Sequence, residues 1–154
     1  MLRKNHLKDI LAANKQAIGT WSIINSIMVA DVIASSGLDF LIIDAEHGCV
    51  SFETAQAMVF ACESHGISPV MRVAEINESL ILRALDIGIH GLQLPNIVTV
   101  EDAKRFVSFA KYPPIGTRGF SPYTRAGLYD FNNGQKLPAE ANKNTLLIAN
   151  VEGI

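Results

Sequence analysis

The sequence has little that would indicate an exported, membrane-bound or nucleic-acid-binding protein. Its two cysteines, Cys49 and Cys62, form no CxxC pair, and no apolar stretch approaches the roughly 20 residues that a membrane span needs. The formal net charge is −2, which gives no electrostatic basis for binding nucleic acid or an anionic membrane. No apolar secretory-signal segment follows the basic residues near the N-terminus. We therefore expect no nucleic-acid or membrane partner, a reducing cytoplasmic location and no disulfide framework.

Two catalytic chemistries are disfavoured by residues that are missing where they would be needed. No GxGxxG motif follows the first predicted strand, which weighs against a dinucleotide site there. No lysine lies at the end of any predicted strand, which argues against an aldolase that works through a Schiff base. Cys49 lies near one strand end, and we interpret it as a small turn residue rather than a nucleophile.

Apolar runs and amphipathic stretches alternate along the chain. Hydrophobic residues make up 49% of its 154 residues, which is enough for one domain with a real core. The alternation predicts strands and helices in turn, and therefore a parallel sheet that is either doubly wound or part of a barrel. We predict strands at residues 18–21, 39–43, 68–73, 90–94 and 145–151, with Pro95 ending the fourth, and helices at residues 25–35, 51–64, 77–87 and 99–110.

The alternation breaks in the segment of residues 112–144, which separates the last predicted helix from the last predicted strand. It is rich in proline and glycine and carries Arg118, Arg125 and, beyond Tyr112, four further aromatic residues. So long a connection is uncommon unless it has a function or its own structure, and we predict a short helix at residues 124–129. The fifth strand comes just before the last residue, whereas a complete (β/α)8 barrel takes about 250 residues. We therefore expect a truncated chain.

Charged residues gather where the predicted strands end. The apolar run at residues 40–43 gives way at once to Asp44, Glu46 and His47, and Arg72 ends an otherwise apolar strand. The carboxyl ends of parallel strands share one face, which is where α/β folds place their chemistry. An imidazole with a pKa near neutrality suits acid–base catalysis, and Asp44 could orient His47.

Two further charges leave alternatives open. Arg72 needs an anionic partner, which could be a substrate carboxylate or enolate, or else an internal salt bridge to Asp44 or Glu46. Glu152 ends the fifth strand, and its carboxylate suits a hard divalent ion such as Mg²⁺ or Mn²⁺. One carboxylate alone does not make a metal site.

Motifs in order along nearly the whole chain resemble the HpcH/HpaI aldolase family. Its members are metal-dependent class II 2-keto-3-deoxy acid aldolases, related to the citrate lyase β-subunit superfamily. The motifs are DF-x3-DAEHG at residues 39–48, MRV at 71–73, RALDIG at 83–88, GLQLP at 91–95 and YPPIGTRG at 112–119. Together they are specific, although any one alone would not be.

The resemblance implies a TIM-type (β/α)8 barrel, of which this single partial domain, residues 1–154, would cover about the first five strands and four helices. It implies reversible cleavage of a 4-hydroxy-2-oxo acid into pyruvate and an aldehyde, with Mg²⁺, Mn²⁺ or Co²⁺ as cofactor. His47 would be the general base and Asp44 its orienting partner. Arg72 would bind the keto-acid oxygens, and Glu152 would be one of two carboxylates on the metal.

The resemblance also implies that Trp21 lines the substrate pocket, and that Asn150 stands where the family usually has Gln, one methylene longer. A homo-oligomer, commonly a hexamer in the family, would place Phe120 and Asp86 beside a neighbouring site; internal packing of that segment is the alternative. The family's second metal carboxylate follows the sixth strand, so we expect the 154 residues alone not to form the metal site. Competing readings are a citrate lyase-like CoA-thioester lyase and a non-catalytic fragment.

Overall fold

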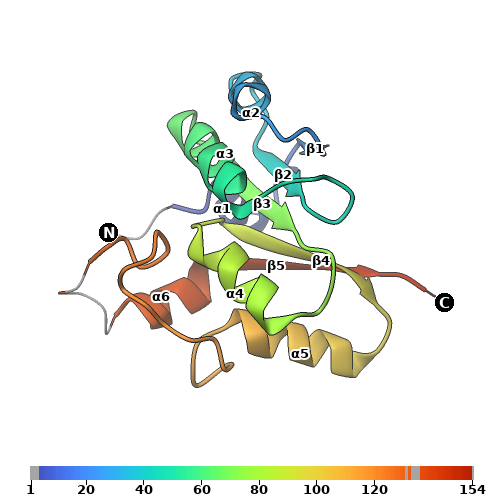
Figure 1. The fold of residues 1–154 in the computed structure, drawn as a ribbon, viewed down its shortest axis with the longest axis vertical. Coiled ribbons are helices and arrows are strands. Elements are labelled where there is room, and N and C mark those ends of the chain that lie inside the picture. Colours follow the sequence, from blue (N-terminus) through green and yellow to red (C-terminus); the bar gives the residue numbers. More distant parts are fainter. Residues whose placement is uncertain (1–3, 131, 133–135, 154) are drawn as a thin grey trace.

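Five parallel strands with helices between them build an α/β unit (Figure 1). The structure is a computed structural model that describes residues 4–130, 132 and 136–153. None of the helices in that part of the chain is long and apolar enough to cross a membrane. The strands are β1 (Gly19–Ser22), β2 (Phe40–Asp44), β3 (Ser68–Arg72), β4 (Gly91–Ile97) and β5 (Leu146–Val151). The helices are α1 (His6–Ala12), α2 (Ile27–Ala34), α3 (Phe52–Ser64), α4 (Glu78–Asp86), α5 (Val100–Ala110) and α6 (Leu137–Asn144).

The order of the strands decides between the two parallel architectures. They lie side by side in sequence order, β1-β2-β3-β4-β5, and every neighbouring pair is parallel. A doubly wound sheet reverses its strand order at a switch point, whereas a barrel adds each strand on the same side. The order is therefore that of a β/α barrel, which confirms the predicted fold class and its extent of about five strands.

Side chains alternate between the two faces of the sheet, as the pleat requires. Leu41 and Ile43 of β2 belong to the main core, where the sheet packs against α2, α3, α4 and α5. Ile42 belongs to a smaller cluster on the other face, together with Val70 of β3 and Leu7 of α1. This second face is the inside of the barrel.

Helix α1 is tied to the N-terminal end of the sheet by hydrogen bonds to distant parts of the chain. The backbone N–H of Leu7 donates to Ser68 Oγ over 2.9 Å. The Asn5 side-chain amide donates to the carbonyl oxygens of His90 and Asn144, each over 2.8 Å. One short helix is thus fastened to β3, to the start of β4 and to the end of α6.

Strand β4 does not end at Pro95, so that prediction is wrong. The strand continues to Ile97 and pairs there with Val151, across a register irregularity between Leu94 and Ile97. Pro95 cannot donate a hydrogen bond, and Asn96 adopts a positive φ of 54°. The irregularity accommodates both residues, as bulges do where a strand contains proline.

The secondary structure between α5 and β5 differs from the prediction in two places. Residues 124–129 form turns rather than the predicted helix, and positive φ angles at Leu128 (58°) and Tyr129 (53°) are incompatible with one. Helix α6 was not predicted, although Pro138 in its first turn is a typical start signal. The described residues of this segment lie at the end of the sheet opposite the C-terminus (Figure 1).

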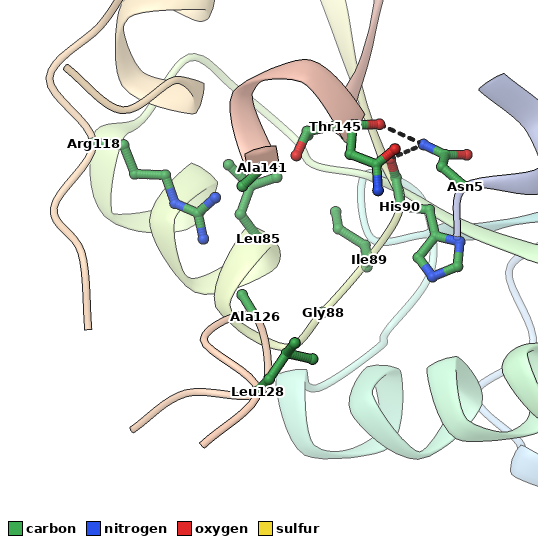
Figure 2. Close-up of a pocket in the computed structure, with 11 residues that line it drawn as sticks. Asn5, Leu85, Gly88, Ile89, His90, Arg118, Ala126, Leu128, Ala141 and Thr145 are labelled. Carbon is green, nitrogen blue, oxygen red and sulfur yellow. Dashed lines mark hydrogen bonds between the residues drawn. The ribbon is translucent and has the colours of Figure 1, made fainter. Parts of the chain in front are cut away.

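Two buried arginines fix this segment to the helices. Arg118, 3% exposed, forms an ion pair with Asp86 over 2.7 Å and stacks on Tyr112. Arg125, 8% exposed, pairs with Glu63 at the end of α3 and stacks on Phe60. A cavity of about 50 Å³ lies beside Arg118, between α4, α6 and the turns that contain Ala126 and Leu128 (Figure 2). Internal packing is thus a role that the segment has within this chain.

Candidate active site

The register of the sheet brings the predicted site residues to one face. Trp21 lies opposite Ile42, Asp44 opposite Arg72, and Arg72 opposite Gln93. Because side chains alternate along a strand, these residues share the inner face with Ile42 and Val70. Ile148 lies opposite Gln93, so Asn150, two residues further along, takes the same face. The inner face is therefore apolar deep in the barrel and polar at its C-terminal rim.

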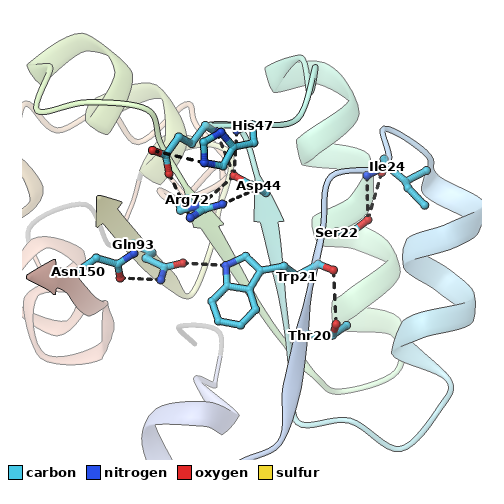
Figure 3. Close-up of polar contacts among 10 residues, drawn as sticks. Thr20, Trp21, Ser22, Ile24, Asp44, His47, Arg72, Gln93 and Asn150 are labelled. Atoms are coloured by element: carbon cyan, nitrogen blue, oxygen red, sulfur yellow. Dashed lines mark hydrogen bonds and ion pairs between the residues drawn. The ribbon is translucent and has the colours of Figure 1, made fainter. Parts of the chain in front are cut away.

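Asp44 and Arg72 form a two-pronged ion pair at this rim (Figure 3). Arg72 Nε donates to Asp44 Oδ1 over 2.9 Å, and Arg72 Nη2 donates to Oδ2 over 2.6 Å. The carboxylate is 1% exposed, whereas the side chain of Arg72 remains 16% exposed. The internal salt bridge foreseen as an alternative for Arg72 is thus present, and the Arg72 side chain stays partly exposed.

The carboxylate of Asp44 also holds the loop that follows β2. Its Oδ1 accepts the backbone N–H of Glu46 over 3.0 Å and that of His47 over 3.4 Å. Burial by itself would raise the pKa of this carboxyl. The hydrogen bond from Arg72 and the two backbone hydrogen bonds outweigh burial and leave the pKa below its ordinary value. Asp44 is therefore an anion that holds Arg72 on the neighbouring strand β3 and the backbone of the loop after β2.

His47 and Glu46 lie on the open side of this pair. The side chain of His47 is 68% exposed, and its Nε2 lies 3.8 Å from Glu46 Oε1. Glu46 Oε2 in turn lies 3.1 Å from Arg72 Nη1. Asp44 therefore positions the backbone of His47, while the imidazole itself lies next to Glu46. The predicted role of Asp44 in orienting the imidazole stays a prediction.

The charge on Arg72 is reinforced by every acid around it. The hydrogen bond to Asp44 raises the pKa of the guanidinium most, burial opposes it, and the charges of Glu46 and Glu152 raise it further. Glu152 follows β5 and therefore lies at the same end of the sheet. Arg72 is thus a firmly charged cation whose side chain stays partly exposed, and a guanidinium suits an anionic or enolate oxygen.

A chain of amide hydrogen bonds crosses the inner face beside this cluster (Figure 3). Trp21 Nε1 donates to Gln93 Oε1 over 3.3 Å, and Gln93 Nε2 donates to Asn150 Oδ1 over 2.8 Å. Gln93 is only 4% exposed. Sequence reasoning gave it no role, although a polar residue amid the apolar neighbours Leu92 and Leu94 is a signal that could have found it.

The sequence predicts a divalent metal ion at this rim, with the carboxylate of Glu152 as one ligand. Glu152 is exposed just after β5 and is the proposed ligand. Among residues 4–130, 132 and 136–153, no group of three or more His, Cys, Asp or Glu side chains is arranged to hold a metal ion. The nearby acids Asp44 and Glu46 are both engaged with Arg72. Glu152 is thus a candidate ligand, and the described residues show no cluster that would complete a metal site around it.

The fold and this rim define a β/α-barrel protein with a charged, partly open site at the carboxyl ends of its strands. The family model described as HpcH/HpaI aldolase/citrate lyase matches residues 17–153. The chain belongs to the HpcH/HpaI aldolase/citrate lyase family, as its motifs indicated.

Curated relatives include 5-keto-4-deoxy-D-glucarate aldolases from Salmonella paratyphi A and Salmonella newport. Each is 34% identical over 148 residues, which is 96% of this chain and 57% of the relative. The chain therefore spans somewhat more than half the length of the curated relatives that it matches.

Solved structures agree with the fold. An HpcH/HpaI aldolase from Desulfitobacterium hafniense superimposes with a TM-score of 0.87 at 28% identity, over 97% of this chain and 58% of that one. The citrate synthase SbnG gives a TM-score of 0.81 at 28% identity, over 94% and 54%. Macrophomate synthase gives 0.80 at 31% identity, over 97% and 52%.

Proposed function

We propose that the protein is a carbon–carbon lyase that cleaves a 4-hydroxy-2-oxo acid of the 2-keto-3-deoxy type into pyruvate and an aldehyde. The observation that carries this proposal is the rim cluster, in which Asp44 fixes Arg72 while His47 stays exposed beside it. A fixed cation beside an accessible base is what a retro-aldol reaction needs, because a proton leaves one atom while negative charge develops on another. Membership of an aldolase/lyase family supports the same reaction.

In the proposed reaction His47 removes the proton of the C4 hydroxyl group. The C4–O bond becomes a carbonyl, the C3–C4 bond breaks, and its electron pair passes to the pyruvate fragment as an enolate. The accessible edge of Arg72 binds the keto-acid oxygens and stabilises the enolate charge as it forms. A proton returned to C3 then gives pyruvate. Asp44 keeps Arg72 in place, and Trp21 and Asn150 border the substrate.

A divalent cation is the cofactor that the family resemblance adds, with Mg²⁺, Mn²⁺ and Co²⁺ as the proposed ions and Glu152 as one ligand. When bound, such an ion acts as a Lewis acid on the 2-keto oxygen. The described residues do not complete its site. We therefore expect the 154-residue chain on its own to bind Mn²⁺ no more tightly than a Glu152→Gln variant in calorimetric titration. Metal-dependent cleavage by the isolated chain would contradict this expectation.

The substrate is proposed to be a sugar-derived keto acid, since relatives at 34% identity are 5-keto-4-deoxy-D-glucarate aldolases. The test incubates the protein with that compound, with and without Mn²⁺, and follows pyruvate with lactate dehydrogenase and NADH. His47→Ala and Arg72→Ala are each expected to lower kcat/KM at least 100-fold, roughly the contribution of a general base or a charge-stabilising group. Gln16→Leu, in an exposed turn, is the control and should leave kcat/KM unchanged. Full activity in either site variant would reject the proposed mechanism.

A citrate-type reaction is the second candidate, because the citrate synthase SbnG superimposes with a TM-score of 0.81. The same preparation would then release oxaloacetate from citrate, or act on a CoA thioester such as citryl-CoA, rather than form pyruvate. Oxaloacetate is followed with malate dehydrogenase, so the two reactions are separable in one experiment. A protein inactive in both assays would favour the non-catalytic alternative.

A cytoplasmic location remains a prediction from the cysteine usage.

A homo-oligomer, commonly a hexamer in the family, is proposed from the resemblance. Phe120 is 37% exposed and packs edge-on against Tyr112, so part of its ring is open to a neighbour. Asp86 is engaged with Arg118 within the chain. Light scattering on Phe120→Ala tests the contact: a smaller assembly is expected, and unchanged assembly with unchanged activity would favour internal packing alone.

A further inference from the structure

Gln93 lies between two residues of the proposed substrate pocket and touches both. Its side-chain carbonyl accepts from Trp21 Nε1 over 3.3 Å, and its amide nitrogen donates to Asn150 Oδ1 over 2.8 Å. We call the hydrogen-bonded series Trp21–Gln93–Asn150 the relay. Its residues come from β1, β4 and β5, so it spans the inner face from one edge strand of the sheet to the other. Figure 3 shows them in one line beside the Asp44–Arg72 pair.

Elementary chemistry fixes the direction of this relay. An indole N–H can only donate, whereas each side-chain amide has one accepting and one donating end. Because Trp21 donates, Gln93 must present its oxygen to Trp21 and its nitrogen to Asn150. Asn150 must therefore accept with its oxygen, and its own NH2 group is the end left over. The orientation of both amides thus follows from Trp21 and not from the amides themselves.

We propose that Gln93 and Trp21 are positioning residues that make Asn150 a hydrogen-bond donor toward the ligand. Asn150 is half-buried at the C-terminal end of β5, two residues before Glu152, so its NH2 group borders the proposed site. A donor at this point selects a ligand with an acceptor there, such as the carbonyl or carboxylate oxygen of a 2-oxo acid. It disfavours a ligand that can only donate there, such as an ammonium group.

The relay also accounts for the short side chain at position 150. The family resemblance gives Gln as the usual residue at this position, and Asn is one methylene shorter. A longer side chain gains reach by itself but has more rotamers to restrict. Here the buried Gln93 holds the shorter amide from behind, so its direction is set by the sheet. This inference rests on the proposed function for its ligand but not for the relay itself.

The relay is tested first without any ligand, by NMR of the protein with ¹⁵N-labelled side chains. The chain has one tryptophan, so the indole N–H gives a single signal. Trp21→Phe is expected to shift or broaden the side-chain amide signals of both Gln93 and Asn150. Gln93→Leu is expected to move the indole signal, and Gln16→Leu, the same change at an exposed position, should move none of them. Asn150 signals that are unchanged in Trp21→Phe would overturn the relay.

The polarity of Asn150 is tested with pyruvate and with methyl pyruvate, a neutral ligand that only accepts hydrogen bonds. Gln93→Glu is the decisive variant, because a carboxylate accepts from Trp21 but cannot donate to Asn150. Asn150 must then turn its NH2 inward and present oxygen to the ligand. Binding of both ligands is expected to weaken about fivefold to tenfold in Gln93→Leu and in Gln93→Glu, the scale of one hydrogen bond.

The two ligands separate polarity from charge. An effect of charge alone in Gln93→Glu would weaken pyruvate and leave methyl pyruvate unchanged, and this result would overturn the donor role of Asn150. Retention of both affinities in the near-isosteric Gln93→Glu would show that Gln93 only fills space. A wild-type protein that binds neither ligand would count against the proposed function, while the NMR comparison would still decide the relay.

Discussion

The two ends of the sheet contain the same kind of ion pair in opposite settings. At the N-terminal end, Arg125 pairs with Glu63 and stacks on Phe60, and Arg118 is enclosed in the same way. At the C-terminal end, Arg72 pairs with Asp44 but has no aromatic cover among the ring contacts of the described residues. Beside it lies the exposed imidazole of His47.

The difference shows how one chemical pair can be structural in one place and available for chemistry in another. An aromatic ring over the guanidinium closes the face through which a ligand would approach, and stacking adds to stability. A guanidinium without such a ring lacks this contribution to stability but keeps its planar face open to a ligand. An ion pair alone is therefore a poor guide to function; what covers it decides its role.

The largest loss of stability is expected at the covered end. Glu63→Ala removes the carboxylate that both Arg125 and His90 contact, and Arg125 is only 8% exposed. Breaking a buried ion pair from one side typically lowers the free energy of unfolding by about 3–5 kcal/mol. Urea unfolding measures it, with Glu53→Ala in the exposed first turn of the same helix as the control, expected to cost at most about 1 kcal/mol. Equal effects of the two variants would refute the distinction.

A smaller loss of stability and a larger loss of binding are expected at the open end. In Asp44→Asn the guanidinium of Arg72 keeps Glu46 at 3.1 Å and part of its hydration. We expect the free energy of unfolding to fall by about 1–3 kcal/mol, less than for Glu63→Ala. Pyruvate affinity should fall at least tenfold, because the cation is no longer held in place. Unfolding in urea and calorimetric titration give the two values; a variant that lost stability but kept full affinity would assign Asp44 to the scaffold alone.

A pH-dependent effect is expected from Lys111 at the covered end. Burial, assisted by the charges of Lys8 and Arg118, lowers the pKa of Lys111 to about 8 from 10.5. The unfolded chain then binds more protons than the folded chain between these two values, so stability should rise with pH across that window. Lys111→Met is expected to flatten this rise when the two proteins are compared by urea unfolding at several pH values. Identical slopes would show that Lys111 is not the group responsible.

The smallest effect on stability is expected at His47. Its side chain is 68% exposed, so His47→Ala should change the free energy of unfolding by no more than about 0.5 kcal/mol. By contrast, the same substitution is expected to lower kcat/KM for cleavage at least 100-fold. Thermal or urea unfolding checks the first statement, and a loss of 2 kcal/mol or more would mean that the imidazole belongs to the scaffold.

Much of this organisation could be predicted from sequence, because it depends on local periodicity. The change from the apolar run in β2 to Asp44 located the rim, and the parallel alternation of elements correctly implied that Arg72 would lie near it. The relay through Gln93 could not be found in this way. It depends on which strand faces which and on the register between them, and both are properties of the assembled sheet.

The misses have a similar cause. Pro95 is a local stop signal, but pairing of Ile97 with Val151 overrides it. Residues 124–129 have a composition that allows a helix, but Leu128 and Tyr129 adopt positive φ angles, and Arg125 pairs with the distant Glu63. In each case a contact between residues distant in sequence accompanies the conformation that the local pattern did not predict.

The ties of helix α1 have a consequence for how the chain is made. Asn5 is made 139 residues before Asn144, yet the carbonyl of Asn144 is one of its hydrogen-bond partners. At about 5–20 residues per second, roughly 7 to 28 seconds of synthesis separate the two residues. Contacts of α1 with Ser68 and His90 can form much earlier, so the helix acquires its ties in stages. Its docking at this end of the sheet is complete only after Asn144 has been made.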